Sequence, residues 1–241
     1  ETATMVNRLK ELYANGNPAD LYHWNSRLAD INKSKIATAP PDQQMKIWFE
    51  YCSELLRAGK NQNCINEVEA LLRERQLTYS SLITKEALPI IELLALAYLR
   101  LGEVNNCQKN HNEHSCIVPL QSEAYHTDKT GSQKAIEIYA QIYSKFPKDE
   151  YKWLLNVAHM TLGNYPSNVP KEYFLNYPSS KMEKSNTPAF KEVAMGLGIA
   201  ENGLSGGVCL DDFNNDGLID IFATSYGMTD QCKLYINTGS G

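Results

Sequence analysis

The sequence predicts a mainly helical chain that is followed by a short β segment. Three observations lead to this prediction. Apolar residues recur at helical spacing through most of the first 163 residues, prolines interrupt residues 164–189, and β-prone runs flank an acidic loop near the C-terminus. With 241 residues and 43% hydrophobic content, the chain is long enough and apolar enough for two domains with packed cores.

The N-terminal segment, residues 1–41, is predicted to be helical. Apolar residues between Met5 and Tyr13 follow a helical rhythm, and the run Asn15–Pro18 ends that helix. A second short helix is predicted to start within residues 18–24, and Pro40-Pro41 marks a break before the next segment.

Residues 42–163 predict helical hairpins. Gly59 separates two stretches of helical periodicity, which are marked by Trp48, Tyr51, Cys52, Leu55 and Ala58, and by Cys64, Ile65, Val68 and Leu71. The first-helix pattern recurs up to Leu101-Gly102, but its second helix starts only at Ser132, so residues 104–131 form an insertion at the turn. Tyr151–Gly163 predicts a further first helix.

This spacing, measured from the turn glycine, resembles the tetratricopeptide repeat, and the resemblance covers about residues 43–163. It implies a small α-solenoid whose concave surface recognises a protein or glycan partner. It also implies that Cys52 and Cys64 lie where the two helices of a hairpin approach most closely, within disulfide range. Two small buried thiols are the alternative at these positions.

Residues 164–189 are predicted to be a linker. Four prolines in this stretch, at positions 166, 170, 178 and 188, prevent it from continuing as a helix. The linker is expected to join the helical domain to the β segment at residues 190–241.

The β segment contains an acidic loop with the spacing of a calcium site. Side-chain oxygens at alternate positions of a tight loop converge on one point, Gly217 allows the sharp turn, and a backbone carbonyl adds a further oxygen. The predicted ligands are Asp212, Asn214, Asp216, the carbonyl of Leu218, and Asp220. Because both flanks are β-prone, we predict a calcium loop inside a β-hairpin; the alternative is a solvated acidic turn without metal.

The stretches GGVCLDDFNNDGLIDIFATSYG and LYINTGSG resemble an FG-GAP/VCBS β-propeller repeat. The most similar type precedes ASPIC/UnbV domains in the cartilage acidic protein family and in bacterial secreted proteins. The resemblance covers about residues 190–241 and implies one blade, with a lead strand starting at Phe190–Val193. Because a propeller needs about four to eight blades, we expect that the chain is truncated after Ser240-Gly241 or that a partner completes the propeller.

The six cysteines fall into three local pairs: Cys52 with Cys64, Cys107 with Cys116, and Cys209 with Cys232. An even count in local pairs predicts disulfides and an oxidising compartment, whereas six reduced thiols in a cytosolic protein are the alternative. Cys209 and Cys232 precede or lie on strands that we expect to be neighbours. Since the chain begins at Glu1 without a targeting segment, we interpret it as mature or trimmed, and as secreted, periplasmic or at the cell surface.

The insertion at residues 104–131 holds three of the five histidines. Three interpretations remain open. A Cys107–Cys116 disulfide staples the loop and the histidines are exposed; or His111, His114 and His126 bind Zn or Cu; or a zinc site includes both cysteine thiolates, which requires a reducing environment.

The remaining sequence features narrow the function. The net charge is −5 without a basic cluster, which argues against a nucleic-acid partner, and no apolar run reaches the ~18 residues of a membrane span. Motifs for a serine nucleophile, a metalloprotease helix or a phosphate-binding loop are absent, so no catalytic residue is assigned. We predict a secreted or periplasmic calcium-binding interaction or scaffold protein; the alternative is a metalloenzyme, or part of one, with a Zn or Cu site at residues 104–131.

Overall fold

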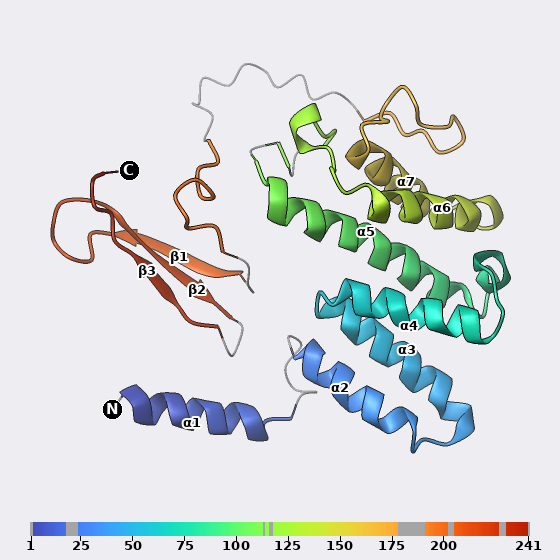
Figure 1. Ribbon diagram of the computed structural model, residues 1–241, viewed down its shortest axis with the longest axis horizontal. Coiled ribbons are helices and arrows are strands. Elements are labelled where there is room, and N and C mark those ends of the chain that lie inside the picture. The colour runs from blue at the N-terminus through green and yellow to red at the C-terminus, as the bar shows by residue number, and fades with distance from the viewer. Residues whose placement is uncertain are drawn as a thin grey trace. The chain divides into compact units, whose positions relative to one another are not determined.

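The computed structural model describes residues 2–17, 24–112, 114–115, 118–177, 191–201, 205–226 and 230–240. Within these ranges the chain has seven α-helices and one three-stranded antiparallel sheet (Figure 1). This confirms a mainly helical chain with a small sheet near the C-terminus. The chain divides into two compact units, one of residues 24–190 and one of residues 1–23 together with residues 191–241.

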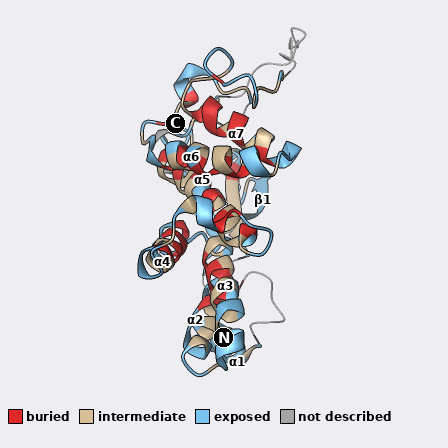
Figure 2. Cartoon of the chain, turned by 90° about the vertical axis from the view of Figure 1, so that its right-hand side faces the viewer, coloured by how far each residue is buried: buried red, intermediate tan, exposed pale blue. Residues whose placement is uncertain are grey.

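The helical unit is a series of helices in which each one packs against the next along the chain. Its helices are α2 (Asn25–Ile36), α3 (Pro41–Arg57), α4 (Asn61–Glu74), α5 (Leu88–Asn110), α6 (Thr130–Lys145) and α7 (Asp149–Thr161), with short 3-10 helices at Tyr79–Leu82 and Ser122–Ala124. Buried residues are concentrated in these helices (Figure 2). Because each hairpin covers an apolar face of its neighbour, the core runs continuously through the unit.

The second half of the predicted N-terminal segment belongs to this helical unit. Helix α2 packs on α3, where Ala29 is fully buried and the Asn25 amide donates a 2.7 Å hydrogen bond to the Glu54 carboxylate. Of the predicted helix start within residues 18–24, residues 18–23 lie outside the described residues, whereas Trp24 is the N-cap of α2, which begins at Asn25.

The hairpin of α3 and α4 follows the sequence prediction closely. Pro41 opens α3 at a position where its missing N–H costs nothing. Gly59, with φ of +72°, ends the helix, and the Lys60 N–H donates to the Leu55 carbonyl at 2.9 Å. A left-handed glycine after a helix closes the last turn in this way.

Helix α5 does not end at Gly102, so this part of the prediction is wrong. The helix continues to Asn110, and the segment that joins it to α6 runs only from residue 111 to residue 129. A Cβ atom on Gly131 would lie 2.6 Å from the Gly102 nitrogen and 2.5 Å from the Tyr98 carbonyl oxygen. The two glycines therefore allow a close crossing of α5 and α6, and Gly102 serves packing.

The first part of the predicted linker is folded onto α7. The side-chain amide of Asn156, which is fully buried, donates to the Tyr173 carbonyl at 2.7 Å and accepts from the Leu175 N–H at 3.1 Å. The Tyr165 hydroxyl accepts from the Tyr177 N–H at 2.9 Å. Residues 164–177 are thus part of the helical unit, and the remaining predicted linker residues lie outside the described ranges.

The other unit contains α1 (Thr2–Asn15) and the strands β1 (Ser205–Asp211), β2 (Asp220–Ser225) and β3 (Lys233–Tyr235) in the order β1-β2-β3. The strands confirm the β-prone flanks of the acidic loop. The predicted lead strand is wrong for residues 191–193, since these residues form no strand and a turn follows them at residues 194–198. There the Ile199 N–H donates locally to the Ala194 carbonyl.

The expectation that the strands at Cys209 and Cys232 are neighbours is also wrong. Cys209 lies opposite Phe222 of β2, and Lys233 lies opposite Ala223 on the other side of that strand. Because neighbouring strands are about 4.8 Å apart, β2 separates the two cysteines by more than the ~7 Å limit for a disulfide. Both cysteines are exposed and unlinked.

Candidate functional site

The acidic loop lies between paired strands. Asp211 at the end of β1 faces Asp220 at the start of β2, so the chain enters and leaves the loop at one point of the sheet. Within the loop, Asn215 and Gly217 have φ values of 61° and 84°. Asn and Gly are the residues that best tolerate this left-handed backbone, which turns the chain tightly.

Carboxylate and amide oxygens point inward and collect the N–H groups of the loop. Asp212 accepts from the Asp216 and Gly217 N–H groups at 3.0 and 2.8 Å. The Asn214 and Asp216 side chains accept from the N–H groups of Asp216 and Leu218 at 3.0 and 2.8 Å. The N–H of Gly217 and those of neighbouring loop residues hold the pKa of Asp212 below its usual range.

Asp220 is the buried member of the set. Its exposure is 0%, and its two carboxylate oxygens accept from the Phe213 N–H at 3.0 Å and the Asn237 N–H at 2.7 Å. The first bond closes the loop, and the second ties the chain beyond β3 to the same carboxylate. A hydrogen bond to a charged acceptor contributes about 1.5–3 kcal/mol, so Asp220 organises the hairpin.

The structure brings the predicted calcium ligands into one loop. Among the described residues, however, no three His, Cys, Asp or Glu side chains form a group that would hold a metal ion. The carboxylates of Asp212, Asp216 and Asp220 therefore do not form such a group in this structure, and the Asn214 amide and the Leu218 carbonyl are donors of other types. Oxygen donors of these types suit Ca²⁺, and calcium binding is therefore kept as a proposal.

A second candidate site lies where the insertion returns to the helices. Asn106 on α5 is 4% exposed, and its amide donates to the Gly102 and Asp128 carbonyls at 2.7 and 2.9 Å. Its side-chain oxygen accepts from the Asp128 N–H at 3.0 Å and from the Thr127 hydroxyl at 3.3 Å. One buried side chain thus fixes the residues that follow His126.

His126 itself is held on both its backbone and its ring. Its N–H donates to the Thr161 carbonyl at 2.8 Å, and its Nδ1 lies 3.1 Å from the Ser132 hydroxyl. His126 is 8% exposed, and this burial lowers the pKa of its imidazole below the usual value, so the ring is neutral at pH 7. Next to it, Tyr125 covers Gly163, where an added Cβ would lie 2.7 Å from the ring.

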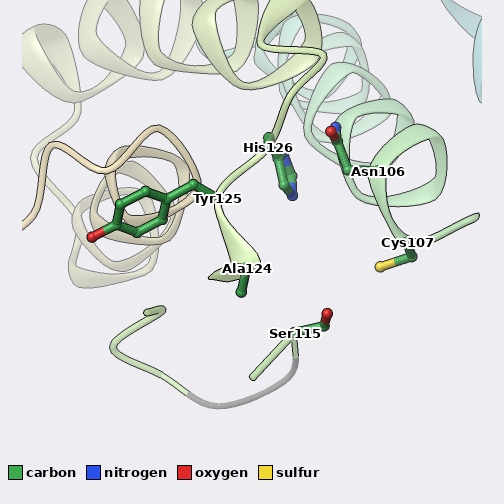
Figure 3. Close-up of a pocket in the computed structure, with 6 residues that line it drawn as sticks. All are labelled: Asn106, Cys107, Ser115, Ala124, Tyr125 and His126. Atoms are coloured by element: carbon green, nitrogen blue, oxygen red, sulfur yellow. The ribbon is translucent and has the colours of Figure 1, made fainter. Parts of the chain in front are cut away.

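A small pocket opens beside His126 (Figure 3). It has a volume of about 20 Å³ and is lined by Asn106, Cys107, Ser115, Ala124, Tyr125 and His126. The three histidines of the predicted Zn or Cu site are placed differently: His111 is exposed, His114 is half-buried and His126 is buried. Among the described residues, these histidines do not form a group that could hold a metal ion. Cys116 lies outside the described residues.

Cys52 and Cys64 lie together in the α3–α4 hairpin. Both are fully buried and unlinked in this structure. Burial, with a contribution from Glu67, raises the pKa of Cys64 to about 12, and burial together with Cys64 raises the pKa of Cys52 further. They are unreactive thiols as they stand, and the disulfide between them stays a prediction.

A groove of about 460 Å³ lies between α2, α3 and α4. Its lining combines apolar and charged side chains, which include Ile36, Met45, Trp48, Leu71, Lys33, Glu67, Glu74 and Arg75. Mixed linings of this kind can bind a partner through an apolar anchor and orient it through charge. The sequence prediction had placed a recognition surface on these helices without identifying a groove.

The sequence prediction missed Asn106 and Asn156. Each is a buried asparagine inside a helix, where asparagine is a poor helix former. A polar residue on the apolar face of a predicted helix was the signal that could have found them.

Comparisons of the chain with protein-family models, curated proteins and solved structures found no match. No helix in the described part of the chain is long and apolar enough to cross a membrane.

Proposed function

We propose that this chain is a secreted or periplasmic calcium-binding scaffold whose tetratricopeptide-like helices recognise a protein or glycan. The observation that carries the proposal is the loop of residues 212–220, in which every side chain of the predicted ligand set belongs to one hairpin turn. The left-handed residues Asn215 and Gly217 and the buried Asp220 support it, because they hold the oxygen donors on a closed loop.

Calcium would act here as a structural ion. The loop concentrates the charges of Asp212, Asp216 and Asp220 with N–H groups as their only described counterparts. An ion between them would offset their mutual repulsion and stabilise the hairpin by mass action, by about 2.7 kcal/mol at a hundredfold excess over Kd. Extracellular calcium sites bind at about 10⁻⁴–10⁻³ M, which fits the proposed compartment.

The proposal that residues 190–241 form a propeller blade also depends on the sheet around the acidic loop. The sheet of three strands exposes Val208 and Leu210 on one face at 63% and 64%. A sheet this small with uncovered apolar side chains is marginal alone, which supports the proposal that it is one blade of an FG-GAP/VCBS-type propeller. Its remaining blades would come from other residues or from a partner.

Calcium titration of the full chain tests the proposal. We expect one Ca²⁺ per chain, slower amide exchange at residues 213–218 with Ca²⁺ than with chelator, and at least tenfold weaker binding in Asp216→Asn. Asp230→Asn is the matched control, because Asp230 is an exposed carboxylate of the same unit outside the loop, hydrogen-bonded to Ser225. Equal exchange with Ca²⁺ and with chelator would refute calcium binding.

The recognition surface is tested separately. Met45→Glu places a charge in the groove at a residue that is 36% exposed, so the fold should persist. Peptide and glycan arrays should show a ligand that binds the wild-type chain and loses at least tenfold affinity for this variant. Ligands that bind both chains equally would place recognition elsewhere.

A further inference from the structure

The chain shortly after β3 folds against the acidic loop. Residues 237–239, which we call the clasp segment, are joined to the end of that loop by two hydrogen bonds. The Asn237 N–H donates to one carboxylate oxygen of Asp220 at 2.7 Å, and the Asn237 side-chain amide donates to the Ile219 carbonyl at 3.3 Å. Two segments that are well separated along the chain therefore meet at one carboxylate.

The clasp segment is itself a tight turn that the same asparagine closes. The Gly239 N–H donates to the Asn237 side-chain oxygen at 2.9 Å, and Gly239 has a φ of +73°. Glycine adopts this left-handed backbone without strain. The turn brings Gly239 against the loop, since a Cβ atom at this position would lie 3.3 Å from the Leu218 side chain.

These contacts fall on the residues that carry the last two predicted calcium donors, the Leu218 carbonyl and the Asp220 carboxylate. The earlier donors are supported within the loop, because Asp212 and Asn214 accept N–H groups of the loop itself. The two parts of the donor set thus depend on different parts of the chain, and the later part depends on the clasp segment.

The burial of Asp220 makes this support important. The residue is 0% exposed, and a buried carboxylate is costly unless hydrogen bonds replace the water that it has lost. Its two oxygens accept from the Phe213 N–H at 3.0 Å and from the Asn237 N–H at 2.7 Å. Because the loss of either donor leaves the carboxylate one partner short, we expect the loop and the clasp segment to open together.

We propose that the clasp segment belongs to the calcium site, with Asn237 as the residue that positions Asp220. Asn237 acts through the carboxylate and does not bind the ion. Release of the clasp segment weakens calcium binding, and by reciprocity the clasp segment opens less often in the calcium-bound protein. This inference rests on the calcium binding proposed above, but the coupling between the clasp segment and the loop exists without metal and is measured separately.

Amide exchange of the full chain in calcium-free buffer tests the coupling. Asn237→Pro removes the N–H that Asp220 accepts, whereas Asn237→Ala keeps it and removes the two side-chain bonds. Exchange at the Phe213 amide should be faster by roughly tenfold or more in Asn237→Pro, and by a smaller factor in Asn237→Ala. Thr238→Ala is the matched control, because the Thr238 hydroxyl pairs with Ser240 in the same part of the chain. Unchanged exchange at Phe213 in both Asn237 variants would overturn the coupling.

Calcium titration tests the link to the metal. We expect binding to be weaker by roughly tenfold or more in Asn237→Pro, weaker by a smaller factor in Asn237→Ala, and unchanged in Thr238→Ala. In the wild-type chain, exchange at the Gly239 amide should be slower with Ca²⁺ than with chelator, which a purely structural role of Asn237 does not produce. Asn237→Ala decides the outcome if Asn237→Pro fails to fold, because the Asn237 side chain is exposed.

The outcomes separate this inference from the proposed function. No calcium binding by the wild-type chain would refute the proposed function, while calcium-free exchange would still decide the coupling. Normal calcium binding that is unaffected in both Asn237 variants would overturn the role of the clasp segment alone. Equal acceleration of all β1 and β2 amides in Asn237→Ala would overturn it as well, because Asn237 would then support the sheet and not the site.

Discussion

Replacing Asp220 by asparagine should loosen the whole hairpin, although it changes one atom. The buried carboxylate accepts two backbone N–H groups, from Phe213 and Asn237. Asparagine keeps one acceptor oxygen and turns an NH₂ group toward the other N–H donor. Losing one charge-assisted bond and weakening the other costs about 2–4 kcal/mol.

The assay is residue-resolved amide exchange by NMR in calcium-free buffer. Because 1.4 kcal/mol corresponds to a factor of ten, exchange at the Phe213 and Asn237 amides should accelerate by roughly 1.5 to 3 powers of ten, up to the limit set by unfolding of the sheet. Asp230→Asn should change these amides by less than about threefold, because its carboxylate is exposed. If both variants accelerate exchange equally, Asp220 does not organise the hairpin.

Three further predictions concern the helical unit. Gly131→Ala should destabilise it by more than about 2 kcal/mol in urea denaturation, because the new Cβ would lie 2.5–2.8 Å from the backbone of α5. Gly102→Ala, whose Cβ would come no nearer than 3.3 Å to another atom, should cost clearly less, and equal effects would contradict this explanation. Burial lowers the pKa of His126 and of His159 in the folded state. The free energy of unfolding should therefore be highest above pH ~6.5 and fall with decreasing pH, by about 1.4 kcal/mol per pH unit for each imidazole, until the folded-state pKa is passed. His159→Gln should make this fall shallower, and an unchanged slope would refute the contribution of His159. Glu69→Gln should cost about 1–2 kcal/mol in the same assay, because its carboxylate accepts two tyrosine hydroxyls at 2.7 and 2.9 Å, and a loss below about 0.5 kcal/mol would show that these bonds contribute little.

Local signals in the sequence were sufficient to predict most of the helices and strands. Gly59 marked the end of α3, and the β-prone runs around residues 212–220 marked the hairpin, because both features depend on neighbours in the chain. Gly102 misled the prediction for the opposite reason. Its function is to let α6 approach, and that contact involves Gly131, 29 residues away, which no local pattern reveals.

The two candidate sites also differ in how far local sequence could predict them. The oxygen donors of residues 212–220 were found from spacing, since a single turn brings them together. The pocket at His126 combines the end of α5 with residues of the insertion, and the hydrogen bonds of Ser132 and Thr161 behind the His126 ring depend on tertiary contacts. The separation of Cys209 and Cys232 likewise follows from the strand order β1-β2-β3, which the local sequence around each cysteine did not reveal.

The anchoring of the insertion by Asn106 has a consequence for protein engineering. Since Asn106 holds residues 127 and 128, the ends of the intervening loop are fixed on the helices. Doubling the length of a loop with fixed ends costs only about 0.6 kcal/mol of closure entropy. The exposed stretch at residues 121–123 is therefore a suitable place to graft a peptide epitope or a fluorescent reporter without disturbing the stacked helices.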